Sequence, residues 1–231
     1  MSAVSFLTIV GRGRVPTART LWWFPVVGVV VGTAAAGVHR GAHGLWPAMA
    51  AGAIVVVVDL VLTGALHLDG LADTADGLLP HMDREQRLTV MAKPDVGAFA
   101  VAVVVSVLMI RWAVLAEPGL EPGALIAIWA MSRTIVAIIP AVVPYARSTG
   151  LATPFLDGAS IWLGVWLIPA AALLIAVTGW PGAVAFAGVL AGAAAVVALA
   201  WRRLGGFTGD VLGAVILVSE TVGLLAIVVQ P

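Results

Sequence analysis

The sequence predicts an all-α integral membrane protein, a polytopic helical bundle that forms a single domain over residues 1–231. Of its 231 residues, 61% are hydrophobic and only 10% are charged. The mean hydropathy of +1.10 is far above that of soluble domains. Basic and acidic side chains both number 12, so net charge favours neither nucleic acid nor an anionic surface as a partner. No cysteine is present, which excludes disulfides, thiolate metal sites and cysteine nucleophiles.

Apolar runs define the individual helices, since a membrane span needs about 20 mainly apolar residues. About seven segments qualify, with six as an alternative count. The predicted spans cover residues 20–38, 45–67, 97–116, 123–144, 160–179, 182–200 and 211–230. Gly179, Pro181 and Gly182 leave only a tight turn between the fifth and sixth spans. No signal-peptide pattern precedes them, and we expect residues 5–10 to form a short amphipathic segment at the interface.

The basic residues predict a cytoplasmic N-terminus in the cell membrane. In that orientation the outside loops carry a single cation, Arg40, and the inside loops carry nine, as the positive-inside rule requires. The nine are Arg12, Arg14, Arg19, Arg84, Arg87, Lys93, Arg147, Arg202 and Arg203. Segments 67–95, 145–158 and 201–210 then share the cytoplasmic face, where one site can draw on all three.

Three aspartates in the string HLDGLADTADG, residues 67–77, are the main candidates for chemistry. Asp69, Asp73 and Asp76 are spaced i, i+4 and i+7, so a helix that directly continues the second span places them on one narrow stripe. Like charges at this spacing repel, and a divalent cation would remove the repulsion. Oxygen ligands suit Mg²⁺ or Mn²⁺ rather than zinc. We predict a catalytic Mg²⁺ site, with Mn²⁺ as a substitute; the alternative is a solvated acidic helix end.

Other polar turns offer phosphate ligands, each with a plainer explanation. His67 is either a phosphate donor or a structural histidine at the interface. Lys93 and the N–H groups around Gly97 form either an anion-binding turn before the third span or an ordinary polar loop. Arg147 is either a positive-inside anchor or a bidentate phosphate ligand.

The segment before the last span is rich in glycine. Gly206 and Thr208 lie where the backbone can come close to a phosphate. Asp210 either caps the following helix or joins the metal site as a catalytic residue.

Four charged residues fall inside the predicted spans, where charge is costly and should face the bundle interior with a partner. They are Asp59, Arg111, Arg133 and Glu220. Arg133 and Glu220 both lie near the middle of their spans, so we predict that they pair; both are also candidates for contact with substrate. Arg111 lies near the outer end of its helix and is expected to snorkel toward the interface.

With these residues assembled, the chain resembles the cobalamin synthase family, the adenosylcobinamide-GDP ribazoletransferases, almost from end to end. The string at 67–77 is highly specific for that family. Shorter matching pieces lie at 6–8, 24–28, 96–99, 144–147 and 209–213, the last leading to Glu220. The sequence departs from the family pattern at 91–95, where Ala92, Lys93 and Asp95 replace a basic–acidic pair and a following basic residue. The resemblance therefore does not extend to an acidic metal ligand in this loop.

The resemblance implies a multi-pass enzyme of the cytoplasmic membrane that needs Mg²⁺ and assembles the nucleotide loop late in adenosylcobalamin (vitamin B12) biosynthesis. It would join GDP-activated adenosylcobinamide to α-ribazole or its 5′-phosphate and release GMP. The implied partners are these two substrates and membrane lipid, not nucleic acid. A homo-oligomer and association with other corrinoid-pathway enzymes are left open.

Attack of a ribose hydroxyl on a pyrophosphate needs charge neutralisation and in-line positioning. We expect one or two Mg²⁺ ions on the aspartates, and phosphate contacts from Lys93, Arg147 and the glycine-rich turn. Two alternatives come from other classes. One is a CDP-alcohol phosphotransferase, whose aspartate motif is matched only in part. The other is a transporter with Asp59, Arg133 and Glu220 lining its path.

Overall fold

The protein is all-helical, as its sequence predicts. A computed structural model describes residues 2–11, 16–148, 150 and 152–229; Arg12 and Arg14 of the orientation argument lie outside the described residues. Helices shorter than a span are α1 (Ser2–Leu7), α3 (Ala48–Leu62), α4 (Leu66–Leu78), α5 (Arg84–Val90) and the 3-10 helices η1 (Thr20–Trp23), η2 (Thr153–Gly158) and η3 (Ile161–Trp166). The longer helices are α2 (Phe24–Leu45), α6 (Ala98–Leu115), α7 (Pro122–Val142), α8 (Leu167–Thr178, continuing η3), α9 (Trp180–Leu204) and α10 (Gly209–Ile227). The one β-bridge in the described part joins Tyr145 to Phe207.

Most predicted spans are confirmed. Six helices are long and apolar enough to cross a membrane, or seven if α3 and α4 together form one broken span. The third to seventh predicted spans coincide with α6 to α10, although residue 230 lies outside the described residues. The first span continues past residue 38 to Leu45, because hydropathy marks only the apolar part of a helix that continues into a polar end. Gly179, with φ of +69°, makes the tight turn between α8 and α9.

The second predicted span is wrong in one respect, because the helix breaks. The α3 helix ends at Leu62, and α4 leaves it at an angle of 89°. Gly64 and Ala65 have φ values of +59° and +55°, which a right-handed helix cannot contain. The apolar run continues through Leu66, so hydropathy does not reveal the break. The aspartate stripe therefore lies on a separate helix and does not directly continue the span.

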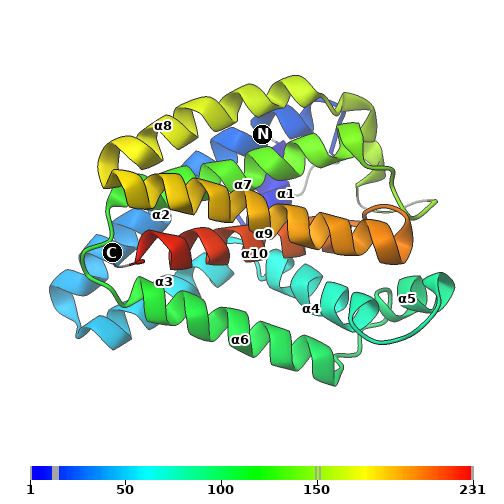
Figure 1. The fold of residues 1–231 in the computed structure, drawn as a ribbon, viewed down its shortest axis with the longest axis horizontal. Helices are drawn as coiled ribbons and strands as arrows, with labels where there is room; N and C mark the ends of the chain where they lie inside the picture. The colour runs from blue at the N-terminus through cyan, green and yellow to red at the C-terminus, as the bar shows by residue number, and fades with distance from the viewer. Residues whose placement is uncertain (1, 12–15, 149, 151, 230–231) are drawn as a thin grey trace.

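The α10 helix lies at the centre of the bundle (Figure 1) and contacts α9, α4, α7 and α6. Together with α7 it is among the most enclosed of the spans. Side chains such as Val105, Met109 and Ile168 leave apolar surface on the outer helices, as expected where a helix faces lipid.

The three polar segments meet at one end of the bundle, on the right in Figure 1. The Arg84 guanidinium donates through Nε to the Leu204 carbonyl at 2.7 Å and through Nη2 to the Ala146 carbonyl at 2.8 Å. Arg147 Nη2 donates to the Met91 carbonyl at 3.3 Å. Arg40 lies elsewhere, beside the turn that joins α6 to α7. The prediction that one site can draw on all three segments is thereby supported.

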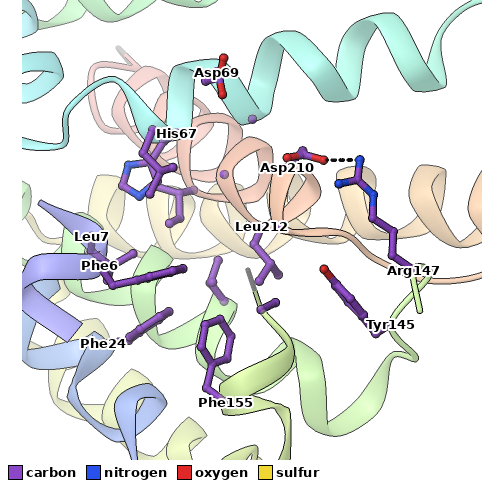
Figure 2. A pocket seen from close by; sticks show the side chains of 17 residues that line it. Phe6, Leu7, Phe24, His67, Asp69, Tyr145, Arg147, Phe155, Asp210 and Leu212 are labelled. Atoms are coloured by element: carbon purple, nitrogen blue, oxygen red, sulfur yellow. Dashed lines mark ion pairs between the residues drawn. The ribbon is translucent and has the colours of Figure 1, made fainter. Parts of the chain in front are cut away.

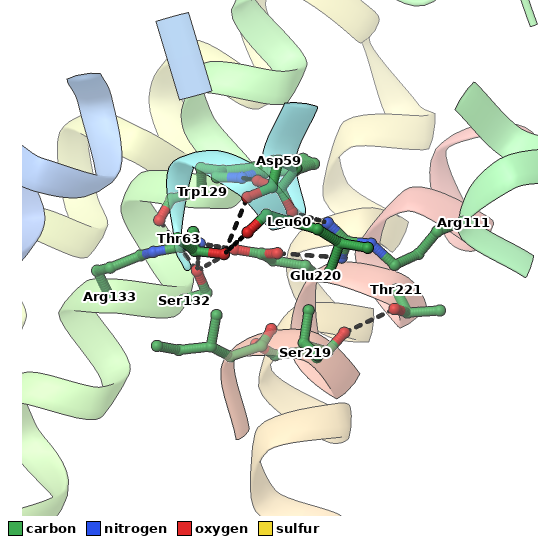
Figure 3. A network of polar contacts seen from close by, with 12 residues as sticks. Asp59, Leu60, Thr63, Arg111, Trp129, Ser132, Arg133, Ser219, Glu220 and Thr221 are labelled. Atoms are coloured by element: carbon green, nitrogen blue, oxygen red, sulfur yellow. Dashed lines mark hydrogen bonds and ion pairs between the residues drawn. The ribbon is translucent and has the colours of Figure 1, made fainter. Parts of the chain in front are cut away.

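The intramembrane charges form one buried ion network, which comprises Asp59 of α3, Arg111 of α6, Arg133 of α7 and Glu220 of α10 (Figure 3). Glu220 Oε1 pairs with Arg133 as predicted, and Glu220 Oε2 accepts from Arg111 at 3.0 Å. Ser132 donates to Glu220 at 2.8 Å, and the Trp129 indole donates to Asp59 at 2.9 Å. Two acids balance two bases, so the network is neutral inside the bundle.

The expectation that Arg111 snorkels is wrong. Its side chain is 1% exposed and its Nη2 donates to Asp59 at 2.9 Å. The guanidinium carbon also lies 5.1 Å from the centroid of the Trp129 ring, within the range of a cation–π contact. The side chain faces inward because two carboxylates in the interior neutralise its charge, a compensation that lipid cannot provide.

Candidate functional site

A cavity of about 120 Å³ opens at the polar end of the bundle (Figure 2). Its lining combines polar side chains with aromatic and aliphatic ones. The polar side chains that line it are His67, Asp69, Tyr145, Arg147 and Asp210, and the aromatic ones are Phe6, Phe24 and Phe155. Aliphatic side chains complete the wall, among them Leu7, Val136, Leu212 and Ile216. The cavity is therefore amphipathic, with charges beside an aromatic interior.

Two loops from different parts of the chain bring Arg147 to Asp210. The Ala146 N–H donates to the Phe207 carbonyl at 2.8 Å, and the Phe207 N–H donates to the Pro144 carbonyl at 3.0 Å. A side chain at Gly206 would place its Cβ 2.3 Å from the Pro144 carbonyl oxygen, so this approach requires glycine. Arg147 Nη2 then lies 3.1 Å from Asp210 Oδ2, with both side chains about one-quarter exposed, at 25% and 23%.

The sequence left open whether Asp210 caps the last span, and the structure shows that another residue is the cap. Thr208 is the N-cap, and its hydroxyl oxygen accepts from the Val211 N–H at 3.3 Å. The same hydroxyl donates to Asp210 Oδ2 at 3.1 Å. Asp210 therefore does not cap the helix but lies in its first turn, where the helix dipole favours a negative charge. Capping occupies the Thr208 hydroxyl, and close loop packing explains Gly206; phosphate contact by either stays a prediction.

The α4 helix packs closely against the start of α10. A Cβ at Gly70 would lie 2.7 Å from the Asp210 carbonyl oxygen, and one at Gly213 would lie 3.3 Å from His67 Cα. Glycine at both contacts therefore lets the two helices approach and brings the α4 carboxylates to Asp210. Asp73 experiences charge repulsion from both Asp210 and Asp69.

We call Asp69, Asp73 and Asp210 the carboxylate cluster. Arg147 is the one cation with which the cluster forms an ion pair in the described part of the chain. Three acids against one base leave an excess of negative charge, in contrast to the balanced ion network.

The Asp76 carboxylate is engaged by the start of α6, although it also repels Asp73, and metal binding by Asp76 stays a prediction. Its Oδ2 accepts from the Gly97 N–H at 2.6 Å and its Oδ1 from the Ala100 N–H at 2.9 Å. It therefore caps the N-terminus of α6 from a neighbouring helix and is only 8% exposed. A Cβ at Gly97 would lie 2.7 Å from this carboxylate. Two of the N–H groups that we expected to be free for an anion, those of Gly97 and Ala100, are therefore engaged by Asp76.

Lys93 lines a second, more open groove of about 700 Å³ together with Arg84 and Arg147. The groove is thus basic where the first cavity is acidic and aromatic. Arg147 lines both the cavity and the groove, so the two adjoin at this side chain.

His67 and Tyr145 are the uncharged polar groups of the cavity. His67 is 3% exposed, and its Nε2 has no hydrogen-bond partner among the described residues. Burial raises the pKa of the Tyr145 hydroxyl, so at neutral pH it stays protonated and can donate a hydrogen bond. By contrast, Arg133 and Glu220 are absent from the cavity lining and belong to the ion network; substrate contact by either stays a prediction.

The carboxylate cluster fits a hard divalent cation by charge and by donor chemistry. Carboxylate oxygens are the ligands of Mg²⁺ and Mn²⁺, and a cation would relieve the repulsion within the cluster. Among the described residues, no three histidine, aspartate or glutamate side chains are already grouped as a metal site. Mg²⁺ commonly takes part of its shell from water and substrate phosphates, so two or three carboxylates are enough.

Sequence reasoning missed the aromatic wall of the cavity. Phe6 and Phe24 fell within segments that carried the family resemblance, which was the available signal. Phe155 lies in η2 with no motif around it, and no spacing rule links three rings from three distant segments. Tyr145 stood beside Arg147 and was passed over for the charged residue.

Comparison with known proteins identifies one family. A family model described as cobalamin-5-phosphate synthase matches residues 1–228. An adenosylcobinamide-GDP ribazoletransferase of Chlorobaculum tepidum is 36% identical, covering 98% of this chain and 92% of the relative. Proteins of the same name from Bradyrhizobium diazoefficiens and Acinetobacter baumannii are 35% and 33% identical, over 96% and 99% of this chain and 90% and 96% of theirs. No solved structure matches the chain significantly.

Proposed function

Because the chain belongs to the cobalamin-5-phosphate synthase family, we propose that it joins adenosylcobinamide-GDP to α-ribazole or its 5′-phosphate and releases GMP. The observation that carries the proposal is the carboxylate cluster beside Arg147, of which Asp69 and Asp210 line an amphipathic cavity. A charged pyrophosphate needs Arg147 and a cation held by the carboxylate cluster to neutralise it, and a nucleoside with an apolar base suits the amphipathic cavity.

The proposed reaction is a phosphoryl-type transfer. A ribose hydroxyl attacks the phosphorus attached to the corrinoid arm; the new O–P bond forms as the bond to GMP breaks. Such a step depends on positioning and on neutralising charge more than on covalent catalysis. Arg147 is well suited to hold a phosphate oxygen in a bidentate contact, and the protonated Tyr145 hydroxyl can donate to another.

Asp69 and Asp73, joined by Asp210, are the residues that would hold Mg²⁺. The bound ion supplies Lewis-acid polarisation of the phosphoryl oxygens and neutralises the leaving nucleotide. In this proposal Asp76 is a positioning residue, because its cap on α6 fixes the far end of α4. A carboxylate of the cluster accepts the proton of the attacking hydroxyl, and Asp210 is the candidate closest to Arg147.

The site faces the cytoplasm in this proposal, because nucleotide substrates are cytoplasmic and most basic residues lie at the same end of the bundle. Cysteine variants at exposed positions test the orientation. A cysteine at Asp157 in an intact cell should resist a membrane-impermeant thiol reagent, while one at Glu121 should react. The opposite pattern would place the site outside.

The activity test uses purified protein in detergent or nanodiscs. Adenosylcobinamide-GDP, α-ribazole 5′-phosphate and Mg²⁺ should yield GMP and a cobalamin phosphate, with no product when the ribazole is omitted. Release of CMP from a CDP-alcohol would favour a CDP-alcohol phosphotransferase instead. Inertness with both substrate pairs, with solute uptake into vesicles, would favour a transporter, although Asp59, Arg133 and Glu220 each form an ion pair within the ion network.

A further inference from the structure

The cavity and the groove that adjoin at Arg147 differ in size and chemistry, and we call them the inner cavity and the outer groove. The inner cavity holds about 120 Å³, and the outer groove about 700 Å³. The inner cavity is lined mainly by aromatic and aliphatic side chains, whereas the groove carries Arg84, Lys93 and Arg147. A joining enzyme must hold two substrates at one phosphorus, so two adjoining compartments of different chemistry suggest one for each.

The inner wall is a cluster of three phenylalanine rings. Phe6 and Phe24 stack with centroids 6.1 Å apart and an interplanar angle of 19°. Phe155 meets Phe6 edge-on at 5.4 Å and 80°, and Phe24 at 6.0 Å and 65°. Phe6 is the partly exposed ring of the three, so a flat heteroaromatic base can stack against it, while the other two rings pack against Phe6. Phe24 and Phe155 are buried in the core, while Phe6 is half-buried on α1.

The outer groove has the opposite character. Arg84 is held in place by the Leu204 and Ala146 carbonyls, so its charge is fixed at the groove wall. Lys93 is exposed, and it forms no ion pair with any of the described residues. Together with Arg147 these cations favour an anionic ligand with several phosphate oxygens.

Resting on the proposed function, we propose that the inner cavity binds the aromatic base of the ribazole and the outer groove binds the guanine nucleotide of the activated corrinoid. The ribose then extends from the phenylalanine wall to the carboxylate cluster, where its hydroxyl loses a proton. Arg147 lies between the compartments, at the phosphorus under attack. The nucleophile enters from the cavity side and GMP, which keeps the electron pair of the broken P–O bond, leaves on the groove side. This is the in-line arrangement that phosphoryl transfer requires.

Two variants test the compartments separately. Phe6→Leu keeps an apolar side chain but loses the ring, so KM for the ribazole should rise about tenfold while KM for adenosylcobinamide-GDP stays unchanged. Lys93→Gln should do the reverse, with a rise of about tenfold in KM for the corrinoid nucleotide alone. Phe186→Leu and Arg202→Gln are the matched controls, because Phe186 is also half-buried and Arg202 also exposed, yet neither lines the inner cavity or the outer groove. Both controls should leave both KM values unchanged.

A uniform rise in both KM values for either variant, or equal effects of the controls, would overturn the assignment. Saturation-transfer NMR with α-ribazole, with and without GMP and Mg²⁺, gives a readout that needs no turnover. The base protons should receive more saturation than the ribose protons in the wild type, and this preference should be lost in Phe6→Leu. Ribose-dominated saturation, or no saturation in either condition, would overturn the inference even if GMP release confirms the proposed function. Base-dominated saturation without GMP release would instead contradict the proposed function alone.

Discussion

The buried ion network and the carboxylate cluster each take one acidic residue from the central helix α10, Glu220 and Asp210 respectively, yet they handle charge in opposite ways. In the network, two acids meet two bases, and each carboxylate has two or three side-chain donors. In the cluster, three acids face one arginine. A fold can keep a neutral network for its own stability, but an unbalanced cluster is costly and is expected where a ligand supplies the missing charge. The difference separates the part that holds the bundle together from the part that we propose performs chemistry.

The largest effect should come from unbalancing the network. Glu220→Gln leaves Arg111 and Arg133 with only Asp59 to neutralise them, which should lower the free energy of unfolding by about 3–5 kcal/mol. Thermal unfolding in detergent measures this change, and KM values of the folded fraction should not move. Glu121→Gln, the same substitution at an exposed position, is the control. An unchanged midpoint in Glu220→Gln would contradict a structural role for the network, and raised KM values would support substrate contact instead.

Exchanging the charges of Arg133 and Glu220 is a poor test of their pairing. Glu220 also accepts from Arg111 at 3.0 Å, so an arginine at position 220 would face a second arginine. The single neutral substitution gives the clearer answer.

The same kind of substitution in the cluster should have the opposite outcome. Asp73→Asn keeps size and removes one repelling charge, so thermal stability should hold or rise. Turnover should fall about 100-fold or more, because a metal ligand is lost. GMP release and the unfolding midpoint are measured on the same preparation, with Asp157→Asn as an exposed control at the same end. Near-normal turnover would remove the metal assignment.

A smaller effect is expected from separating the helices that form the cluster. Gly70→Ala places a methyl group 2.7 Å from the Asp210 carbonyl oxygen, so α4 must move away from α10. Small displacements of catalytic groups are costly, and turnover should fall about tenfold. Gly37→Ala is the matched control, since a Cβ there meets nothing within 4 Å. Equal activity of the two variants would show that the Gly70 contact does not position the cluster.

The sequence predicted the bundle better than the site, for physical reasons. Long apolar runs determine spans directly, and the cost of charge in lipid made the pairing of Arg133 with Glu220 predictable. The helix break at Gly64 and Ala65 was not, because it is set by backbone dihedrals within a continuous apolar run. Helical spacing placed Asp76 on the stripe correctly, but it could not reveal that α6 would use this carboxylate as its cap.

The site also depends on contacts between distant segments. Arg147 and Asp210 were each singled out, and the shared end of the bundle was predicted from the basic loops. Their pairing depends on the Tyr145–Phe207 bridge, which has no signature in either segment. The aromatic wall likewise exists only after α1, α2 and η2 have packed.

The most direct test of the central claim is divalent-cation binding by the cluster. Mn²⁺ binding is followed by electron paramagnetic resonance, with adenosylcobinamide-GDP present and the ribazole omitted so that no turnover occurs. The wild type and Asp157→Asn should bind Mn²⁺ and release it to Mg²⁺, whereas Asp73→Asn should bind little or none. Equal Mn²⁺ binding in Asp73→Asn, or no binding in the wild type, would contradict the assignment of the unbalanced carboxylates to a metal.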